Sequence, residues 1–383
     1  MSKYSIDDLD NDYVKYLYLK IPILKEENKD SVKLLQLVLD YIESTSKKVN
    51  YLTYLIFKKS PKNILEKSFK NIIGHKKNIE NNKKKFSQTN YKYEKIYNIK
   101  VLALIEAIIL VTLNYYEKKN KNKNIIFPNT KIEITNLMQN VNTKEIKFVM
   151  NKVKDIDLGN YILNLYKRDD IDSYQKETIT FNLLQKIAEK LQYLQDNFSF
   201  IHGDFHSGNI FVKENNNNDY NINFIDVEYS TIKLPTKKNV NKTIILTSPL
   251  NENISRKEIL NINKEPNLKA LDLFHLIQDI KSFDNLNTIK KINNSVKINE
   301  LKTLITKLSK LYKRPCKLSS KLHNSTRISG FFNDNYSNLI PENFIKILNI
   351  NTIRTPINNN PSPTKRQKQS SIIVNCNTGY ETP

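Results

Sequence analysis

The chain has 383 residues, and its 61 lysines and arginines against 39 acidic residues give a formal net charge of +22. This length accommodates roughly two to three domains of ~150 residues, enough for a two-lobed enzyme with a sizeable core. The only cysteines, Cys316 and Cys376, form no pair suited to zinc or a disulfide framework, which favours a reducing, intracellular and cytoplasmic location. Lysine is spread among asparagines rather than concentrated in a stripe, so the charge does not by itself predict nucleic-acid binding.

The beginning of the chain lacks the basic start and apolar core of a signal peptide, and we expect an extension or a first helix over residues 1–30. The longest apolar run, residues 101–113, is shorter than the ~20 residues that span a bilayer and contains Glu106. It therefore predicts a buried helix and not a membrane anchor.

Residues 34–42 and 49–57 are apolar and β-prone, and the polar stretch between them predicts a hairpin. Residues 60–92 are rich in lysine and asparagine, which indicates a polar insertion or a surface helix. The apolar helix at 101–113 follows, and residues 147–162 predict a strand that runs through a connector into a helix.

The second half of the chain reads as mostly helical. Apolar residues at helical spacing over 179–194 predict a helix that stops shortly before His202. Two short strands are expected next, joined by an asparagine-rich turn, and then three further helices; these elements lie at residues 209–212, 220–225, 268–280, 298–312 and 341–348.

The pattern that carries chemistry is Asp204, then Asn209 five residues later, and then Asp226 after two apolar strands. Phosphoryl transfer needs one carboxylate to accept or orient the proton of the attacking hydroxyl, and oxygen ligands that hold magnesium on the ATP phosphates. Asp204 suits the first role. Asn209 and Asp226 supply the hard oxygen ligands that Mg²⁺ prefers.

The segment HGDFHSGNIFV resembles the catalytic loop of the protein-kinase superfamily, and specifically that of aminoglycoside phosphotransferases and choline kinases, which typically reads HGDLHPGN. His206 occupies the place of the second histidine, and FIDVEYS around Asp226 is similar to the IDFEY form of the DFG segment. The resemblance implies ATP and Mg²⁺ as cofactors and His202 as a structural buttress. It leaves His206 as either a phosphate contact or a loop-packing residue.

The resemblance implies an α+β, bilobal protein-kinase-like fold with a small β-rich N-lobe, which contains one main helix, and a larger, mostly helical C-lobe. The N-lobe would cover residues 31–147, with the polar insertion near 60–92, and the C-lobe residues 148–350. The final segment, 351–383, has few core-forming residues and predicts a disordered basic tail.

The stretch KFVMNKV is similar to the hinge that binds adenine through its backbone, which would place Met150, Asn151 and Lys152 against the nucleotide and Phe148 near the gatekeeper place. An ordinary buried strand is the alternative interpretation. Residues 271–273 resemble the helix whose aspartate, here Asp272, ties down the backbone of the catalytic loop.

The N-lobe departs most from the family pattern, in which a glycine-rich loop accompanies a strand lysine paired with a helix glutamate. The chain has only six glycines, and the first is Gly74. We expect Lys58 to contact phosphate, with Lys59 as the alternate, since strand alternation cannot be phased there. Glu106 is the expected partner, because an unpaired carboxylate on a buried helix face is costly.

Together these residues predict a kinase, an ATP-dependent phosphotransferase acting on an alcohol group. The length of the segment between Asp226 and Asp272 favours a protein Ser/Thr acceptor, as in a divergent protein kinase of the kind found in large DNA viruses and other low-GC genomes. A small-molecule kinase of the aminoglycoside or choline kinase type is the alternative, and a pseudokinase binding module is the second. We expect ATP and a protein or small-molecule hydroxyl as partners, without nucleic acid or membrane.

Overall fold

The computed structural model describes the chain in segments, which cover residues 4–27, 31–42, 85–88, 92–97, 100–120, 126–128, 130–137, 143–151, 155–215, 219–248, 266–283, 298–311 and 337–353. Several sequence predictions fall outside these residues, namely Lys58, Lys59, Lys152, the strand at 49–57 and most of the tail.

Helices make up most of the described structure. They are α1 (Asn11–Lys20), α2 (Leu34–Ile42), α6 (Lys100–Lys119), α7 (Leu158–Leu165), α8 (Ser173–Phe198), α10 (Pro266–Ser282), α12 (Ile298–Leu311) and α14 (Pro341–Ile353). Short 3₁₀ helices are η1 (Ile6–Asp8), η2 (Pro22–Lys25), η3 (Ser207–Asn209) and η6 (Ser337–Leu339).

The strands form small antiparallel sheets. They are β1 (Lys85–Gln88), β2 (Lys92–Tyr97), β3 (Thr130–Leu137), β4 (Thr143–Asn151), β5 (Ile156–Asp157), β6 (Ile210–Glu214), β7 (Tyr220–Phe224), β8 (Thr231–Lys233) and β9 (Ile245–Thr247). One sheet has the order β1-β2-β4-β3, a second β5-β6-β7, and β8 pairs with β9. The described chain is therefore a mixed, mostly helical structure with small sheets.

The strand predicted at residues 34–42, the first of the predicted hairpin, is wrong, because this segment forms the helix α2. Its leucines are strong helix formers, and Leu35, Val38 and Leu39 are all buried. The polar residues Gln36 and Asp40 are one turn apart and hydrogen-bond to each other at 2.9 Å. An amphipathic helix accounts for both the burial and this spacing.

The other predicted elements are largely confirmed. The helices α6, α8, α10, α12 and α14 and the hairpin β6–β7 form where the sequence indicates them. The bounds of several elements differ. Strand β1 and the first residue of β2 lie inside the predicted insertion, and α14 continues to Ile353, past the predicted start of the tail. Helix α6 continues to Lys119, and α8 begins at Ser173, six residues before its predicted start. Among the described helices, none is long and apolar enough to cross a membrane.

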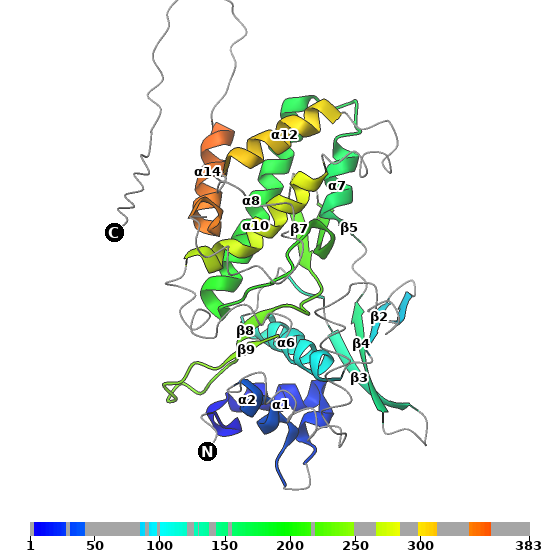
Figure 1. Cartoon of the computed structure of the whole chain (residues 1–383), viewed down its shortest axis with the longest axis vertical. Coiled ribbons are helices and arrows are strands. Elements are labelled where there is room, and N and C mark those ends of the chain that lie inside the picture. Colours follow the sequence, from blue (N-terminus) through cyan, green and yellow to red (C-terminus); the bar gives the residue numbers. More distant parts are fainter. Residues whose placement is uncertain are drawn as a thin grey trace, which may run out of the picture.

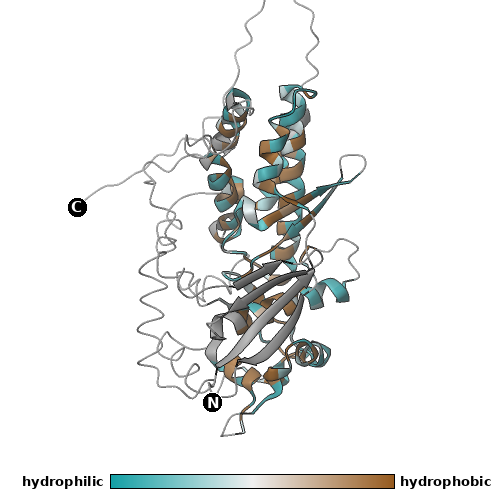
Figure 2. Cartoon of the chain, turned by 90° about the vertical axis from the view of Figure 1, so that its right-hand side faces the viewer, coloured by the Kyte–Doolittle hydropathy of each residue, from teal (hydrophilic) through white to brown (hydrophobic). Residues whose placement is uncertain are grey.

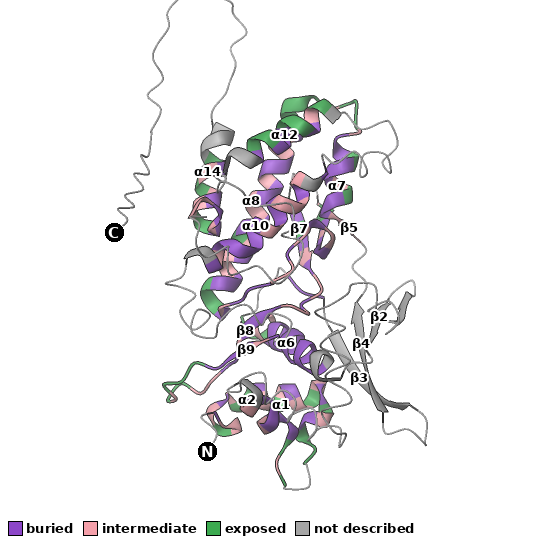
Figure 3. Ribbon diagram, viewed as in Figure 1, coloured by how far each residue is buried: buried purple, intermediate pink, exposed green. Residues whose placement is uncertain are grey.

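The helices α7, α8, α10, α12 and α14 gather at one end of the molecule, and α1, α2, α6 and the sheet β1–β4 lie at the other (Figure 1). In Figure 2, the helices of the first group alternate apolar and polar residues around their axes, as expected for helices with one face in a core. Helix α6 is different, because it is buried along most of its length (Figure 3). It contacts α1, β3, β4 and β9, so it connects several parts of this end of the molecule.

The long helix α8 delivers the chain to the candidate site. It begins with a capping box in which the Asp172 carboxylate accepts the N–H of Gln175 at 2.7 Å, and the Gln175 side chain accepts the N–H of Asp172 at 3.2 Å. It ends at Ser199, whose φ of 48° breaks the helix. The HGDFHSGN segment follows within three residues.

Candidate active site

The loop that contains Asp204 runs from the end of α8 to β6. Ile201 forms a β-bridge with Thr231, which fixes the start of the loop next to β8. Gly203 has a φ of 80°, in the left-handed region that favours glycine, and so turns the chain sharply before the aspartate. The Asp204 side chain is 45% exposed, so its carboxylate is accessible to a substrate.

Asp272 on α10 holds this loop by its backbone. Its two carboxylate oxygens accept the N–H groups of His202 and Gly203, each at 2.9 Å, and the side chain is fully buried. Burial raises the pKa of Asp272 to about 6, although both N–H donors favour the charged form. The role that the sequence indicates for Asp272 is thus confirmed.

A second aspartate of α10 holds the other end of the loop. Asp279 accepts the backbone N–H of Ser207 at 2.8 Å. It lies seven residues after Asp272, which puts both carboxylates on one face of the helix, two turns apart. Asp279 belongs to no motif of the sequence. The seven-residue spacing was the signal that could have found it.

Asn209 is joined to Asp204 as the motif spacing suggests. The side-chain amide nitrogen of Asn209 donates to the backbone carbonyl of Asp204 at 2.9 Å. The backbone carbonyl of Asn209 accepts the N–H of Ile225 at 3.0 Å. Because the amide NH₂ is used in this way, the amide oxygen is the end that remains suited to a metal ligand. The buried Asn209 therefore links the loop that contains Asp204 to the residue before Asp226.

His206 folds back over its own turn. Its Nδ1 accepts the N–H of Gly208 at 3.1 Å, so the neutral imidazole carries its proton on Nε2. That Nε2 lies 3.8 Å from Oδ2 of Asp204, and the His206 side chain is 43% exposed. The ring therefore packs against the backbone of its own loop, and its Nε2–H lies beside the Asp204 carboxylate.

His202 buttresses the loop from inside. Its Nε2–H donates to the carbonyl of Ile225 at 2.9 Å, and its own carbonyl accepts the Ser230 hydroxyl at 2.9 Å. Complete burial lowers the pKa of His202 to about 4, so the ring is neutral at physiological pH. This side chain joins the two halves of the site and confirms the buttress role.

Asp226 has a φ of 59°, an uncommon conformation for a residue other than glycine. Such strain costs of order 1 to 3 kcal/mol and persists where the surroundings hold it. The preceding residue, Ile225, is fixed by two hydrogen bonds. Its carbonyl accepts from His202, and its N–H donates to the backbone carbonyl of Asn209. The conformation directs this part of the chain toward α6.

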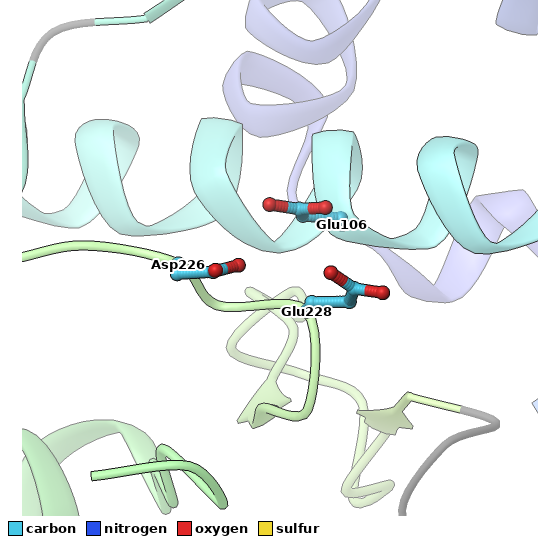
Figure 4. A group of neighbouring side chains, drawn as sticks. All are labelled: Glu106, Asp226 and Glu228. Atoms are coloured by element: carbon cyan, nitrogen blue, oxygen red, sulfur yellow. The ribbon is translucent and has the colours of Figure 1, made fainter. Parts of the chain in front are cut away.

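Figure 4 shows the carboxylates of Asp226 and Glu228 facing Glu106 on α6. One oxygen from each of the three side chains lies within 4.8 Å of the others, and Glu106 is only 3% exposed. Carboxylates this close repel one another, and a divalent cation relieves the repulsion. The donor set of three carboxylates is hard oxygen chemistry, which fits Mg²⁺.

The structure thus brings two predicted residues together, Glu106 and Asp226, and adds Glu228. The predicted partner of Glu106, Lys58, lies outside the described residues. Glu228 stood in the DVEY motif without an assigned role, and its position two residues after Asp226 was the available signal. Glu106 could be recognised as unusual within an apolar helix, but its neighbours come from a segment 120 residues further along the chain.

Strand β2, which immediately precedes α6, contains a further lysine. In the backbone register Lys95 pairs with Phe148, and Phe148 pairs with Ile132 on its other side. Because directly paired residues share a face of a sheet, the register puts Lys95, Phe148 and Ile132 on one face. A lysine in the strand that leads into α6 is a candidate for binding an anion.

The predicted hinge residues Met150 and Asn151 end strand β4. Met150 pairs with both Tyr93 and Thr130, where β3 begins. Asn151 therefore lies past the start of the β3 pairing, at the point where the chain leaves the sheet for β5. Lys152 is outside the described residues.

No protein-family model matches the chain, and no curated protein matches it. Among solved structures, the chain is similar to WaaP in complex with acyl carrier protein, with 10% identity and a TM-score of 0.31 over 73% of this chain and 96% of that chain. It is also similar to vaccinia related kinase 3, with 13% identity and a TM-score of 0.33 over 70% of this chain and 87% of that chain. These TM-scores are too low for either likeness to support an activity.

Proposed function

We propose that this chain is an ATP- and magnesium-dependent phosphotransferase with a bilobal protein-kinase-like fold, which transfers the γ-phosphoryl group of ATP to a hydroxyl group. The observation that carries the proposal is the joined arrangement of Asp204, Asn209 and Asp226. Asn209 is bonded to the Asp204 backbone and to Ile225, so the accessible carboxylate and the two proposed metal ligands belong to one braced unit.

In the proposed reaction, Asp204 accepts the proton of the acceptor hydroxyl as its oxygen attacks the γ-phosphorus. The bond from the γ-phosphorus to the bridging oxygen breaks, and ADP leaves. Asp226 and Asn209 would hold magnesium, with Glu106 and Glu228 beside Asp226 able to complete the set. The bound ion would neutralise phosphate charge. His206, through the accessible Nε2–H, would donate to a phosphate oxygen.

For the nucleotide, we propose that the backbone at Met150, Asn151 and Lys152 binds adenine where β4 ends. The phosphate lysine has two candidates. Lys58 follows a β-prone segment of the sequence. Lys95 lies in β2, the strand that precedes α6 and Glu106 in the chain. The sheet position of Lys95 opposite Phe148 supports it as the stronger candidate.

The acceptor we propose is a protein serine or threonine. This choice rests on the length of the segment between Asp226 and Asp272, within which β8 and β9 form a hairpin. The features that favour a small-molecule alcohol are His206 and the DVEY sequence, which resemble the aminoglycoside and choline kinase style of site. The two acceptor classes are separated directly by experiment.

The test is transfer of γ-labelled ATP to a mixed protein substrate and to a panel of small amines and alcohols, combined with calorimetric ATP binding with and without Mg²⁺. Asp204→Asn should abolish transfer and leave ATP affinity nearly unchanged. Asp226→Asn should remove the dependence of binding on Mg²⁺. Asp170→Asn is the matched control, since Asp170 is exposed and forms its ion pair with the exposed Arg168.

Transfer to proteins alone supports the protein kinase, and transfer to small molecules alone supports the alternative. ATP binding without any transfer would identify a pseudokinase. Absence of both binding and transfer in the unmodified protein contradicts the proposal.

A further inference from the structure

The N-terminal segment, defined here as residues 4–27 and 31–42, packs against the side of α6 that faces away from the carboxylate cluster. Tyr115 lies nine residues after Glu106, which at about 100° per residue puts it on the opposite side of the helix. Tyr115 donates its hydroxyl to Oδ1 of Asp10 at 3.1 Å. The N-terminal segment therefore supports α6 from behind Glu106.

A second contact to α6 is fully buried. The Tyr13 and Thr112 hydroxyl oxygens lie 2.7 Å apart, and Thr112 donates to the carbonyl of Ile108 at 2.6 Å. Because the single hydroxyl hydrogen of Thr112 is used there, Tyr13 is the donor of the pair. The Tyr13 ring also packs edge-on against Tyr115, with centroids 5.3 Å apart.

The same segment is bonded to the chain that follows Asp226. The N–H of Asp10 donates to the carbonyl of Pro235 at 3.1 Å, and the N–H of Lys237 donates to the carbonyl of Asp8 at 3.0 Å. The carboxylate of Asp8 also pairs with Lys242 at 2.9 Å. These bonds hold the connection between β8 and β9, which follows Asp226 and Glu228 in the chain.

Helix α6 and β8 are themselves joined, because the Tyr116 hydroxyl donates to the carbonyl of Lys233 at 3.0 Å. Three parts of the molecule are thus bonded pairwise: α6, the chain after Asp226, and the N-terminal segment. Figure 1 shows α1 and α2 beside α6, on the side away from the large group of helices. A closed set of three contacts resists relative movement better than the single contact between α6 and β8.

We infer that the N-terminal segment is a positioning element of the active site, which sets the distance between Glu106 on α6 and the carboxylates of Asp226 and Glu228. The inference rests on the proposed function in so far as that cluster binds the metal of the reaction. Its central residue is Asp10, because one side chain caps α1 through the N–H groups of Asp12 and Tyr13 and also reaches α6. The same residue bonds Pro235 through its backbone.

The experiment compares Asp10→Ala with Asp10→Asn and with Asp172→Ala in the full chain. Asparagine caps helices and accepts from Tyr115, so Asp10→Asn is the conservative rescue. Asp172→Ala removes an N-cap of the same type from α8, far from the N-terminal segment, and so controls for the loss of a cap alone. The measurements are Mn²⁺ affinity by electron paramagnetic resonance and hydrogen exchange of peptides covering α6 and residues 224–248.

Asp10→Ala should weaken Mn²⁺ binding about tenfold, in the range typical of coupling between sites, and speed exchange over 224–248. The Mn²⁺ affinity of Asp10→Asn should stay within about twofold of that of the unmodified protein. The same is expected of Asp172→Ala, even where it lowers the melting temperature as much as Asp10→Ala does. If Asp10→Ala and Asp172→Ala behave alike in both measurements, the inference is wrong.

The outcome is separable from that of the proposed function. Mn²⁺ binding and its loss in Asp10→Ala, without any phosphoryl transfer by the unmodified protein, would support the positioning role and contradict the enzyme. If the unmodified protein binds no Mn²⁺, the hydrogen exchange of residues 224–248 decides the inference alone. Exchange there that is unchanged by Asp10→Ala would then overturn it.

Discussion

Asp272 accepts the backbone N–H of His202 through Oδ2 at 2.9 Å, in a position with no solvent exposure. The bond joins α10 to a loop that lies 70 residues earlier in the chain. It makes the conformation of the loop that contains Asp204 dependent on the packing of the helical end of the molecule.

Replacing Asp272 by asparagine should therefore be costly. The two carboxylate oxygens of Asp272 accept the N–H groups of His202 and Gly203. In asparagine one of these oxygens becomes an NH₂ group, which would face an N–H donor and leave it without an acceptor. We expect a loss of roughly 2 to 3 kcal/mol in the free energy of unfolding, as for buried hydrogen bonds to a charged group. Urea unfolding monitored by circular dichroism gives the value.

Asp196→Asn is the control for Asp272→Asn. Asp196 of α8 forms an ion pair with Lys269 of α10, the helix that also carries Asp272, and the Asp196 side chain is partly exposed. Such pairs contribute about 0 to 1 kcal/mol. Equal effects of the two substitutions would show that the buried bonds to the loop do not matter.

The choice between Lys95 and Lys58 can be made by binding. If Lys95 contacts phosphate, Lys95→Met should weaken ATP binding roughly 10- to 100-fold, the equivalent of one lost charge-assisted hydrogen bond. Lys92 is the matched control, because it lies in the same strand on the other face of the sheet. A loss in Lys58→Met but not in Lys95→Met would return the assignment to Lys58.

Glu117, near the end of α6, predicts a pH dependence of stability. One of its oxygens accepts the N–H groups of Ile126 and Phe127 at 2.7 and 2.9 Å, and burial raises the pKa of Glu117 to about 7. Because the folded-state pKa lies above the value of 4.5 for the free group, the folded protein holds the proton more tightly. This contribution to stability is complete below pH 4.5 and is lost as the pH rises through 7.

Glu117→Gln keeps an acceptor oxygen for both N–H groups and cannot ionise. Between pH 6.5 and 8, the unmodified protein should lose up to about 1 kcal/mol of unfolding free energy relative to this variant. Denaturant titrations of both proteins at several pH values measure the difference. The titration of His202 is common to both proteins and cancels. Parallel pH profiles would mean that Glu117 is already ionised in the folded state.

Gly159 on α7 lets this helix approach the loop between Asp204 and β6 closely. A Cβ at this position would lie 2.8 Å from Oγ of the buried Ser207 and 3.3 Å from Phe283. Alanine is favoured in a helix by about 1 kcal/mol, yet we expect Gly159→Ala to lower stability by roughly 1 to 3 kcal/mol because of the overlap. Thermal unfolding measures this loss.

Combining Gly159→Ala with Ser207→Ala removes the nearest overlapping atom. The double variant should be more stable than the sum of the two single effects indicates, and a double-mutant cycle measures the coupling. Additive effects would show that the loop relaxes around the new methyl group without cost.

The elements that could be predicted from the sequence are those with a strong local pattern. Helix α6 was evident from its apolar spacing, and α8, α10 and the hairpin β6–β7 from periodicity and turn residues. The α2 segment was misread because a nine-residue apolar run fits a strand or a helix equally well, and only its packing decides. The resemblance indicates that Asp272 holds the loop. It gives no such indication for Asp279, because no motif contains that residue.

The sequence by itself determined the spacing of Asp204, Asn209 and Asp226, since a loop and a short hairpin place these residues through local geometry. Only the tertiary structure decided that Glu106 faces Asp226 and Glu228, and that Asp10 bridges α6 and the chain beyond β8. Those relationships join residues more than 100 positions apart. They depend on how the buried faces of distant elements pack against one another. That packing is the sum of many weak contacts, and it produces no local sequence pattern from which it could be predicted.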